Sequence, residues 1–398
     1  MKKISLYVFC TFFLWGSLFS QSKDTPDNRV NVAFLSGSIN LKSSNESTPL
    51  AEDAKKGMFI NVLIDGKNYI FLIDTGFTFS AVDENLNINM ESLGIKRPVT
   101  DNFGLQKETE LYKFDFSVDN NTFKDFAFLK LDLSEVSKAA CVKIDGIIGI
   151  NVLKNLNWKM LKNENKLYFS NQPYSYIGFG EAIPLEFAGN YFPIIKMQIN
   201  NKEFYVGLDT GATSGLLLST QIYNSIFNDY KKLSQGKGYA FYSVVDKNSV
   251  EIRKTKVKKI LIGDLALQDY NVIVTQGKPI LGQEILLNDD LILNFTTKEL
   301  AFGKNISSKL NSTDFNSFGL CRPPKDSNKV ELCFLWEDNK NYKNLKIGDR
   351  ILQVDSVNTT NINDAEFCSL KEYISTKKGA VKLKLQRGNK QLDVLVNQ

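Results

Sequence analysis

The sequence predicts a mostly β protein, with two homologous β-barrel lobes followed by a small α+β domain. Three observations predict this fold class. A pair of apolar runs ending in Asp-Thr-Gly occurs twice, each copy leads into strand-like segments at matching intervals, and a segment of different character follows residue 304. With 398 residues and 43% apolar content, the chain can bury several separate cores.

The N-terminal segment predicts export. Residues 1–20 begin with Met-Lys-Lys and continue through the apolar run "ISLYVFCTFFLWGSLF", which is typical of a signal peptide. An uncleaved anchor is the alternative. We expect a periplasmic, outer-surface or secreted protein without stable membrane insertion after cleavage. Residues 21–54 form a polar connector in which "VNVAFLSGSI" is a candidate first strand.

Each lobe opens with a predicted hairpin. In the first lobe, residues 55–172, "MFINVLIDGKNYIFLIDTG" consists of two alternating apolar runs joined by Asp65-Gly66. In the second lobe, residues 173–304, "FPIIKMQINNKEFYVGLDTG" repeats the arrangement with Asn200-Asn201 at the turn. Chance alone would place Asp-Thr-Gly in a chain of this length on the order of a tenth of a time.

The internal repeat continues beyond these tripeptides. Asp209 follows Asp74 by 135 residues, and the glycines of "DGIIGINVL" and "KPILGQEIL", Gly149 and Gly282, are 133 residues apart. Each segment is followed by a closing strand, "NKLYF" or "KELAF". The sequence therefore contains two homologous β units end to end.

Composition limits the chemistry. The chain has no histidine, which excludes Ser-His-Asp and Cys-His catalysis and nearly all usual zinc sites. Its five cysteines show no Cys-x-x-Cys spacing, so we expect no metal and no cofactor. The net charge of +5 comes from interspersed charges of both signs, so we expect no nucleic-acid partner. The side-chain groups that remain available for catalysis are carboxylates, hydroxyls, lysines and thiols.

Two copies of apolar-apolar-Asp-Thr-Gly, each followed by apolar-apolar-Gly, resemble the bilobal aspartic peptidases of the retropepsin and pepsin clan, over about residues 55–304. The resemblance implies acid-protease-like barrel lobes and a polypeptide substrate. It also implies that Asp74 and Asp209 are catalytic and hold one water between them. Carboxylates about 3 Å apart cannot both ionise, so one would serve as acid and the other as base.

The resemblance assigns supporting roles to the rest of each tripeptide. Thr75 and Thr210 stand where the family has hydroxyls that bond across to the opposite loop. Gly76 and Gly211 would let the backbone turn tightly and point amides at the carboxylates. The apolar-apolar-Gly strands would lie behind these loops and exclude water.

The family also closes a hairpin flap over its substrate. The Gly-rich, aromatic stretch "GKGYAFYSVV", residues 236–245, is the candidate, with Gly238, Tyr239, Phe241 and Tyr242 contacting substrate. An ordinary scaffold hairpin is the alternative, because periodicity cannot distinguish the two.

The third segment, residues 305–398, enters through a linker-like stretch, "NISSKLNSTDFNS". Its "NLKIGDRILQVDSVN" resembles the Gly-Asp turn and following strand of PDZ domains, and "DAEFCSLKEYIST", "AVKLKLQRG" and "QLDVLVN" fit the helix and strands of such a domain. The resemblance implies a small PDZ-like domain that contacts a peptide or protein partner, with Phe318, Gly319 and Leu320 in its carboxylate-binding loop. A β-rich domain that merely packs on the lobes is the alternative.

Two further expectations depend on the PDZ alignment. Pro323-Pro324 would lie in the groove strand and lack N–H groups, so we expect poor binding of free C-termini. Cys321 and Cys333 would lie on neighbouring antiparallel strands, and this alignment would allow a disulfide between them in an exported protein, although the sequence leaves their disulfide state open.

The leading function is therefore an exported, monomeric aspartic endopeptidase whose PDZ-like domain contacts substrate or partner. One departure from the family pattern supports an alternative function. The residue after the first Asp-Thr-Gly is bulky Phe77, whereas Ala212 in the second lobe has the small size usual for the clan. If Phe77 distorts the pair, the chain would be a non-catalytic peptide-binding protein on the same scaffold. No motif supports a small-molecule or carbohydrate binder.

Overall fold

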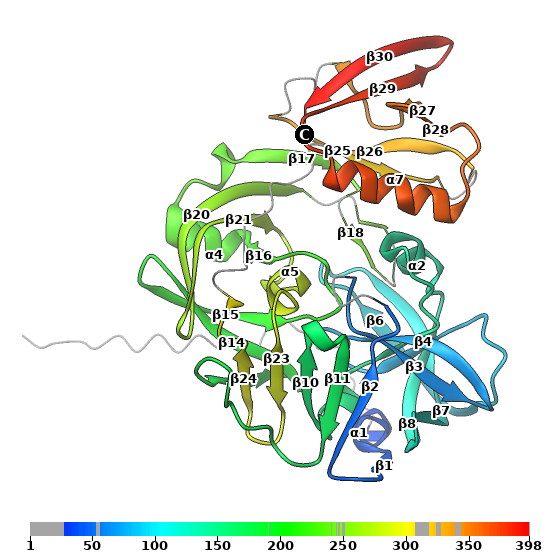
Figure 1. The fold of residues 1–398 in the computed structure, drawn as a ribbon, viewed down its shortest axis with the longest axis vertical. Coiled ribbons are helices and arrows are strands. Elements are labelled where there is room, and N and C mark those ends of the chain that lie inside the picture. Colours follow the sequence, from blue (N-terminus) through cyan, green and yellow to red (C-terminus); the bar gives the residue numbers. More distant parts are fainter. Residues whose placement is uncertain are drawn as a thin grey trace, which may run out of the picture.

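The computed structural model describes residues 28–397 except for short stretches at 53–55, 190, 240, 244, 246, 249–250, 307–317, 324–327 and 339–343. The chain is mostly β, with a six-stranded barrel and further sheets (Figure 1). The expected signal peptide, residues 1–20, lies outside the described residues. None of the described helices is long and apolar enough to cross a membrane.

Six strands of the first half pair in a closed ring. The ring runs β8–β5–β9–β4–β3–β7 and closes where β7 pairs with β8. The strands are β3 (Phe59–Ile64), β4 (Lys67–Ile73), β5 (Ser80–Asp83), β7 (Gln106–Val118), β8 (Asn121–Leu131) and β9 (Gly146–Ile148). The β4–β9 and β5–β8 pairs are parallel. Alternating phenylalanines of β7 and β8 fill the interior.

The second half repeats this ring in the same order, β21–β16–β22–β15–β14–β20, and closes where β20 pairs with β21. The strands are β14 (Phe192–Ile199), β15 (Lys202–Leu208), β16 (Leu216–Ser219), β20 (Ile252–Ile262), β21 (Leu265–Thr275) and β22 (Ile280–Leu281). The parallel pairs, β15–β22 and β16–β21, fall at the matching places. The sequence repeat is thus also a repeat of topology.

Both predicted hairpins are confirmed. β3 turns into β4 at Asp65-Gly66, and β14 turns into β15 at Asn200-Asn201. The φ angles of these four residues are 50°, 76°, 50° and 61°. Two-residue hairpin turns of type I′ require positive φ at both positions, and Gly, Asn and Asp tolerate it best.

A six-stranded sheet joins the two halves, lying below the second-half ring and beside the first-half ring in Figure 1. Its order is β12–β24–β23–β10–β11–β2, and the central pair, β10 with β23, has one strand from each half. The bounds are β2 (Asn45–Pro49), β10 (Asn157–Leu161), β11 (Lys166–Ser170), β12 (Ile183–Pro184), β23 (Leu291–Asn294) and β24 (Glu299–Phe302). The two predicted closing strands are β11 and β24, so they are confirmed.

The candidate first strand is largely wrong. Residues Asn28–Leu35 form helix α1, and only Ser38–Asn40 form a strand, β1, which pairs with β8. The helix buries Ala33 and Phe34 on one face. Phe34 lies edge-on to the ring of Phe79, with 5.4 Å between centroids. This packing with a distant residue favours the helix over the strand that the local pattern suggested.

The third segment has a hydrophobic core of its own. It contains β25 (Phe318–Cys321), β26 (Val330–Trp336), β27 (Arg350–Val354), β28 (Val357–Asn358), α7 (Asp364–Thr376), β29 (Ala380–Arg387) and β30 (Lys390–Asn397). The predicted helix and the two strands after it are confirmed. At the Gly-Asp turn before β27, buried Asp349 accepts hydrogen bonds from both Nε and Nη2 of Arg387.

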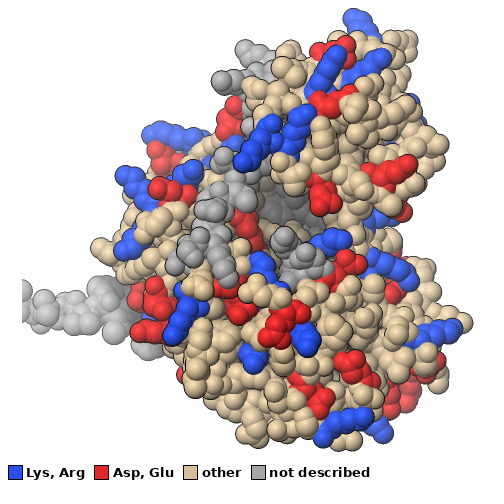
Figure 2. Space-filling model, viewed as in Figure 1, with Lys and Arg blue, Asp and Glu red and all other residues tan. Residues whose placement is uncertain are grey.

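This third unit is attached to both halves. Strand β26 pairs with β17 (Ser234–Gly238) of the second half. Helix α7 lies beside α2 (Ser134–Ala140) of the first half, where Lys371 Nζ donates a hydrogen bond of 2.7 Å to the carbonyl of Ala139 (Figure 1). Figure 2 shows a hollow between the third unit and the rings, and charges of both signs interspersed over this face.

The Cys321–Cys333 disulfide that the PDZ alignment would allow is not formed between these two described residues. Among the described cysteines, the disulfide joins Cys141, just after α2, to Cys368 on α7. Cys321 and Cys333 do lie on neighbouring antiparallel strands, but the pairing shifts at Gly319 and sets Cys321 opposite Glu331. Leu320 lies opposite Leu332, so no residue of β25 lies directly opposite Cys333 and the two cysteines are not a cross-strand pair.

Candidate active site

The two aspartates lie at equivalent places in the two rings. Asp74 follows the last residue of β4, and its amide donates to Ile148 on the parallel strand β9 at 3.0 Å. Asp209 follows β15, and its amide donates to Leu281 on β22, also at 3.0 Å. Both aspartates are only partly exposed. The predicted apolar-apolar-Gly segments thus hold the backbone of both aspartates.

Reciprocal threonine bonds link the two Asp-Thr-Gly loops. The Thr75 amide donates to Thr210 Oγ1 at 3.0 Å, and the Thr210 amide donates to Thr75 Oγ1 at 3.0 Å. The Thr75 hydroxyl donates to the carbonyl of Leu208, and the Thr210 hydroxyl to that of Ile73, each at 2.8 Å. Both threonines are fully buried. Four hydrogen bonds in a dry environment therefore fix the separation of the two aspartates.

Each glycine of the tripeptides lies against the carboxylate from the opposite loop. A Cβ on Gly76 would lie 2.4 Å from Asp209 Cγ, and a Cβ on Gly211 would lie 2.3 Å from Asp74 Oδ2. Only glycine fits at these two positions. The same glycines donate their amides to the carboxylate of their own loop, at 2.8 Å to Asp74 and 2.9 Å to Asp209. The structure thus brings all six sequence-predicted residues of the two tripeptides together.

The electrostatics of the aspartate pair favour protonation. Burial raises the pKa of Asp74 well above its ordinary value, and the neighbouring charge of Asp209 raises it further, against hydrogen bonds from the amides of Gly76 and Phe77. Burial also raises the pKa of Asp209, while hydrogen bonds, including those from Gly211 and Ala212, act in the opposite direction. Two adjacent carboxyls with raised pKa values retain one proton between them as a coupled pair.

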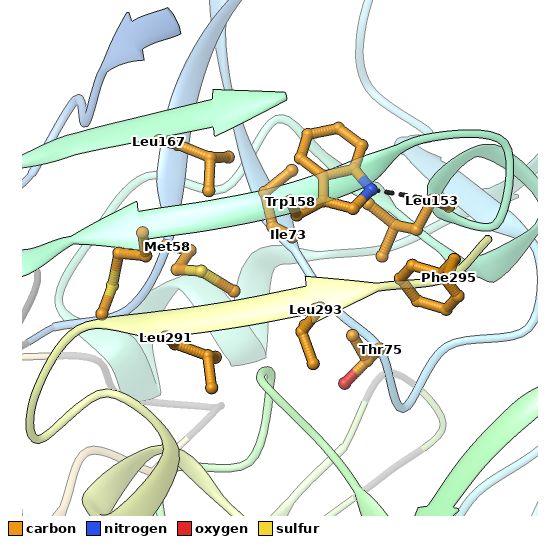
Figure 3. A pocket seen from close by; sticks show the side chains of 10 residues that line it. Met58, Ile73, Thr75, Leu153, Trp158, Leu167, Leu291, Leu293 and Phe295 are labelled. Atoms are coloured by element: carbon orange, nitrogen blue, oxygen red, sulfur yellow. Dashed lines mark hydrogen bonds between the residues drawn. The ribbon is translucent and has the colours of Figure 1, made fainter. Parts of the chain in front are cut away.

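The space behind the loops is apolar and tightly packed. Thr75 borders a cavity of about 10 Å³ between the first loop and the six-stranded sheet, lined by side chains such as Leu153, Trp158, Leu293 and Phe295 (Figure 3). A volume near the lower limit for one water, with an apolar lining, stays dry. The first loop is therefore backed by a dry, apolar core on the side of the six-stranded sheet.

Two side chains that sequence reasoning missed also position the loops. Asn151 accepts hydrogen bonds from the amide and hydroxyl of Ser80, at 2.7 and 2.9 Å. Gln283 Nε2 donates to the carbonyl of Thr210 at 2.6 Å. Asn151 lies two residues after Gly149, and Gln283 directly follows Gly282, so a polar residue just beyond each apolar-apolar-Gly motif was the available signal.

The flap candidate lies partly outside the described side chains. Gly238 ends β17, and the amide of Tyr239 donates to the carbonyl of Cys333 in the third unit. Phe241 and Tyr242 form the short strand β18, and the placement of their side chains is not described. Tyr239 is 42% exposed. This stretch therefore contacts the third unit as well as the second ring.

A second hairpin, missed from the sequence, reaches across the two halves. It consists of β6 (Glu91–Thr100) and β7, and at its tip Asn102 exchanges two hydrogen bonds with the backbone of Lys278 in the second half. The hydroxyl of Ser243 donates to Asp101 at the same tip. The signal was present, because the 135-residue repeat maps the flap candidate onto residues 101–110.

The predicted PDZ loop residues lie on a strand. Phe318, Gly319 and Leu320 belong to β25, which pairs with β26, and Phe318 is buried in the core of the third unit. In the described part of the chain, no group of three acidic, histidine or cysteine side chains could hold a metal ion. No known family model matches the chain, and no curated protein matches its sequence.

Proposed function

We propose that the chain is an exported aspartic-type endopeptidase whose two rings are homologous acid-protease-like lobes and whose third unit is PDZ-like. One observation supports this most strongly. Two partly buried carboxylates, one from each half, are held against each other by the reciprocal bonds of Thr75 and Thr210. Only a reaction that needs two coupled carboxyl groups makes use of this arrangement.

The proposed reaction is the hydrolysis of a peptide bond by an activated water. With one shared proton, the ionised carboxylate takes a proton from the water as it attacks the peptide carbonyl. The protonated carboxyl donates to the carbonyl oxygen as negative charge develops there. Proton transfer to the leaving nitrogen then breaks the C–N bond. Asp74 and Asp209 act as one titrating unit in each step.

The non-catalytic alternative would require Phe77 to displace one carboxylate. The two loops instead make equivalent hydrogen bonds, Gly76 to Asp74 and Gly211 to Asp209. Phe77 packs against the hydrophobic core. This equivalence favours the catalytic function.

The remaining parts of the proposal concern location and partners. The apolar N-terminal run and the Cys141–Cys368 disulfide support export, because disulfides persist in oxidising compartments. The third unit, attached across both halves, is proposed to contact the polypeptide substrate or a protein partner. We propose a monomer that needs no nucleic acid, metal or cofactor.

The test uses the mature protein and a reduced, alkylated protein as unfolded substrate, between pH 4 and 7. The proposal expects discrete cleavage products by mass spectrometry, and their loss on adding a peptide mimic with a central hydroxyl group. Asp209→Asn serves as the matched control and should give no products. Products of equal yield from Asp209→Asn, or none from the wild type, would refute the proposal.

A further inference from the structure

Arg97 on β6 is a cation with buried donors, and no acidic side chain of the described residues forms an ion pair with it. Its Cζ lies 4.6 Å from the centroid of the Phe79 ring. Two guanidinium nitrogens, Nε and Nη1, are buried and have no hydrogen-bond partner among the described residues. Burial lowers the pKa of Arg97. Burying donors of a charged group without a partner is unfavourable, so a group absent from the free chain is the natural partner.

The two acidic residues of β7 nearest to Arg97 in the register do not face it. Arg97 is paired with Thr109 on β7, so these two side chains share one face of the hairpin. Glu108 and Glu110 flank Thr109 and therefore point to the other face. Glu110 already accepts a hydrogen bond from Ser92 there.

The surroundings of Phe79 contain a further cation. Phe34 lies edge-on to Phe79, and Lys154 Nζ lies 5.1 Å from the centroid of the Phe34 ring. Lys154 donates to the carbonyl of Asn151, and burial lowers its pKa. Two cations on one aromatic cluster create a positive potential that favours an anionic group.

Arg97 also lies near the loop of the first aspartate through its contact with Phe79. The β6–β7 hairpin leaves the first half and touches the second half at its tip, through Asn102 and Lys278. Arg97 lies on this hairpin four residues before Asp101, and the ring beneath it belongs to Phe79, five residues after Asp74. The guanidinium therefore lies between the crossing hairpin and the loop that carries the first aspartate. Arg97 remains partly exposed, so a solute can reach it.

We propose that Arg97 is a specificity-determining residue that binds the carboxylate of a Glu or Asp side chain in a polypeptide substrate. A planar guanidinium can donate two parallel hydrogen bonds to a carboxylate, and the Phe79 ring holds the guanidinium in orientation. This inference rests on the proposed peptidase function and adds a substrate class to it, polypeptides with an acidic residue at one fixed distance from the cleaved bond.

The test uses pairs of peptides that are identical except that one has Glu and the other has Gln at a single position. A series of such pairs places this position at each residue of a cleaved peptide in turn. For the wild type, kcat/KM should be at least about 10-fold higher with Glu at one position. Arg97→Met should bring that ratio close to one, and Arg97→Lys should leave an intermediate ratio. Lys154→Met, which removes a nearby charge but not the guanidinium, should keep the preference. An absent preference in the wild type, or an intact one in Arg97→Met, would overturn the proposal.

Two control measurements distinguish carboxylate binding by Arg97 from a structural role of Arg97 and from a failure of the proposed peptidase function. The melting temperature of Arg97→Met should equal or exceed that of the wild type, because the variant loses an unpaired buried charge; a lower value would indicate a structural role and contradict the proposal. If the wild type cleaves no peptide, the peptidase function fails separately. Fluorescent Glu and Gln peptide pools then test Arg97 directly by anisotropy. Tighter Glu binding that Arg97→Met abolishes supports the carboxylate site, and equal binding of both pools by the wild type overturns it.

Discussion

At the scale of single residues, the positions after each Asp-Thr-Gly determine how strongly the aspartate pair holds its proton. Phe77 and Ala212 have no side-chain hydroxyl to offer the carboxylates. Within the described chain, the hydroxyls of Thr78 and Thr213 make no hydrogen bond to either aspartate. Backbone amides, and for Asp209 also the carboxyl of Asp74, stabilise the charged form, but the effect of burial on the pKa values dominates.

The first prediction is a shifted pH optimum. Because burial raises the pKa values of Asp74 and Asp209, the active window between the two macroscopic values of the pair shifts upward. We expect kcat/KM to peak at roughly pH 5 to 6. Ala212→Ser adds a hydroxyl that favours the ionised form, so its profile should move to lower pH, whereas Ala212→Gly should not. A wild-type peak at or below about pH 3 would contradict the prediction.

The second prediction follows from linkage between protonation and folding. A carboxyl whose folded pKa is raised binds its proton more tightly in the folded state than in the unfolded state. Its contribution to stability is therefore fully present below the unfolded pKa and is lost as the pH rises through the folded pKa. The Asp209→Asn variant has no carboxyl at this position that can lose a proton. The free energy of unfolding of the variant should therefore fall less between pH 4 and pH 8 than that of the wild type. Urea titrations at both pH values measure the difference, and equal falls would contradict it.

At the scale of elements, the two Asp-Thr-Gly loops depend on each other for their positions. Each threonine hydroxyl bonds to a carbonyl of the other half and accepts an amide from the opposite threonine. The loops are therefore one structural unit made from two distant segments, held by β9 and β22 from behind.

The third prediction concerns this unit. Thr75→Val keeps the shape but leaves the Thr210 amide and the Leu208 carbonyl without a partner in a buried place. The free energy of unfolding should fall by about 2–6 kcal/mol, since each of the two buried unsatisfied groups costs about 1–3 kcal/mol. Thr75→Ser retains the hydroxyl and should lose much less. Equal losses for the two variants in urea unfolding would show that the hydroxyl bonds are not responsible.

Structural elements that depend on short stretches of sequence could be predicted from the sequence. The Asp65-Gly66 and Asn200-Asn201 hairpins and the two aspartates follow from turn chemistry and from the repeat. Helix α1 and the Cys141–Cys368 disulfide could not be predicted in this way. The helix depends on the packing of Phe34 against Phe79, and the two cysteines are 227 residues apart in the sequence. The crossing β6–β7 hairpin was missed although the repeat indicated its place, because a non-local contact, Asn102 with Lys278, identifies it.

At the scale of the whole molecule, the third unit connects the two halves. It continues the second-half sheet through β17 and β26, and it is covalently joined to the first half through Cys141 and Cys368. The two halves are thus tied together both by the six-stranded sheet and by the third unit.

The fourth prediction tests this tie. Cys368→Ser opens a loop of more than two hundred residues and should lower the free energy of unfolding by about 2–5 kcal/mol. Cys141→Ser should have the same effect, and the double variant no more than either. Mass spectrometry of a non-reduced digest should link the peptides containing Cys141 and Cys368. A link between Cys321 and Cys333 in that digest would contradict the structure.

The central claim is that Asp74 and Asp209 form one catalytic unit. It is tested most directly by kcat/KM for a cleaved peptide, measured for the wild type, Asp74→Asn, Asp209→Asn and the double variant, each with an unchanged circular dichroism spectrum. We expect each single variant to lose at least about 10³-fold and the double variant to lose no more, because the effects of residues that act as a unit are non-additive. Losses that multiply in the double variant, or a single variant that keeps more than about a tenth of wild-type activity, would contradict it.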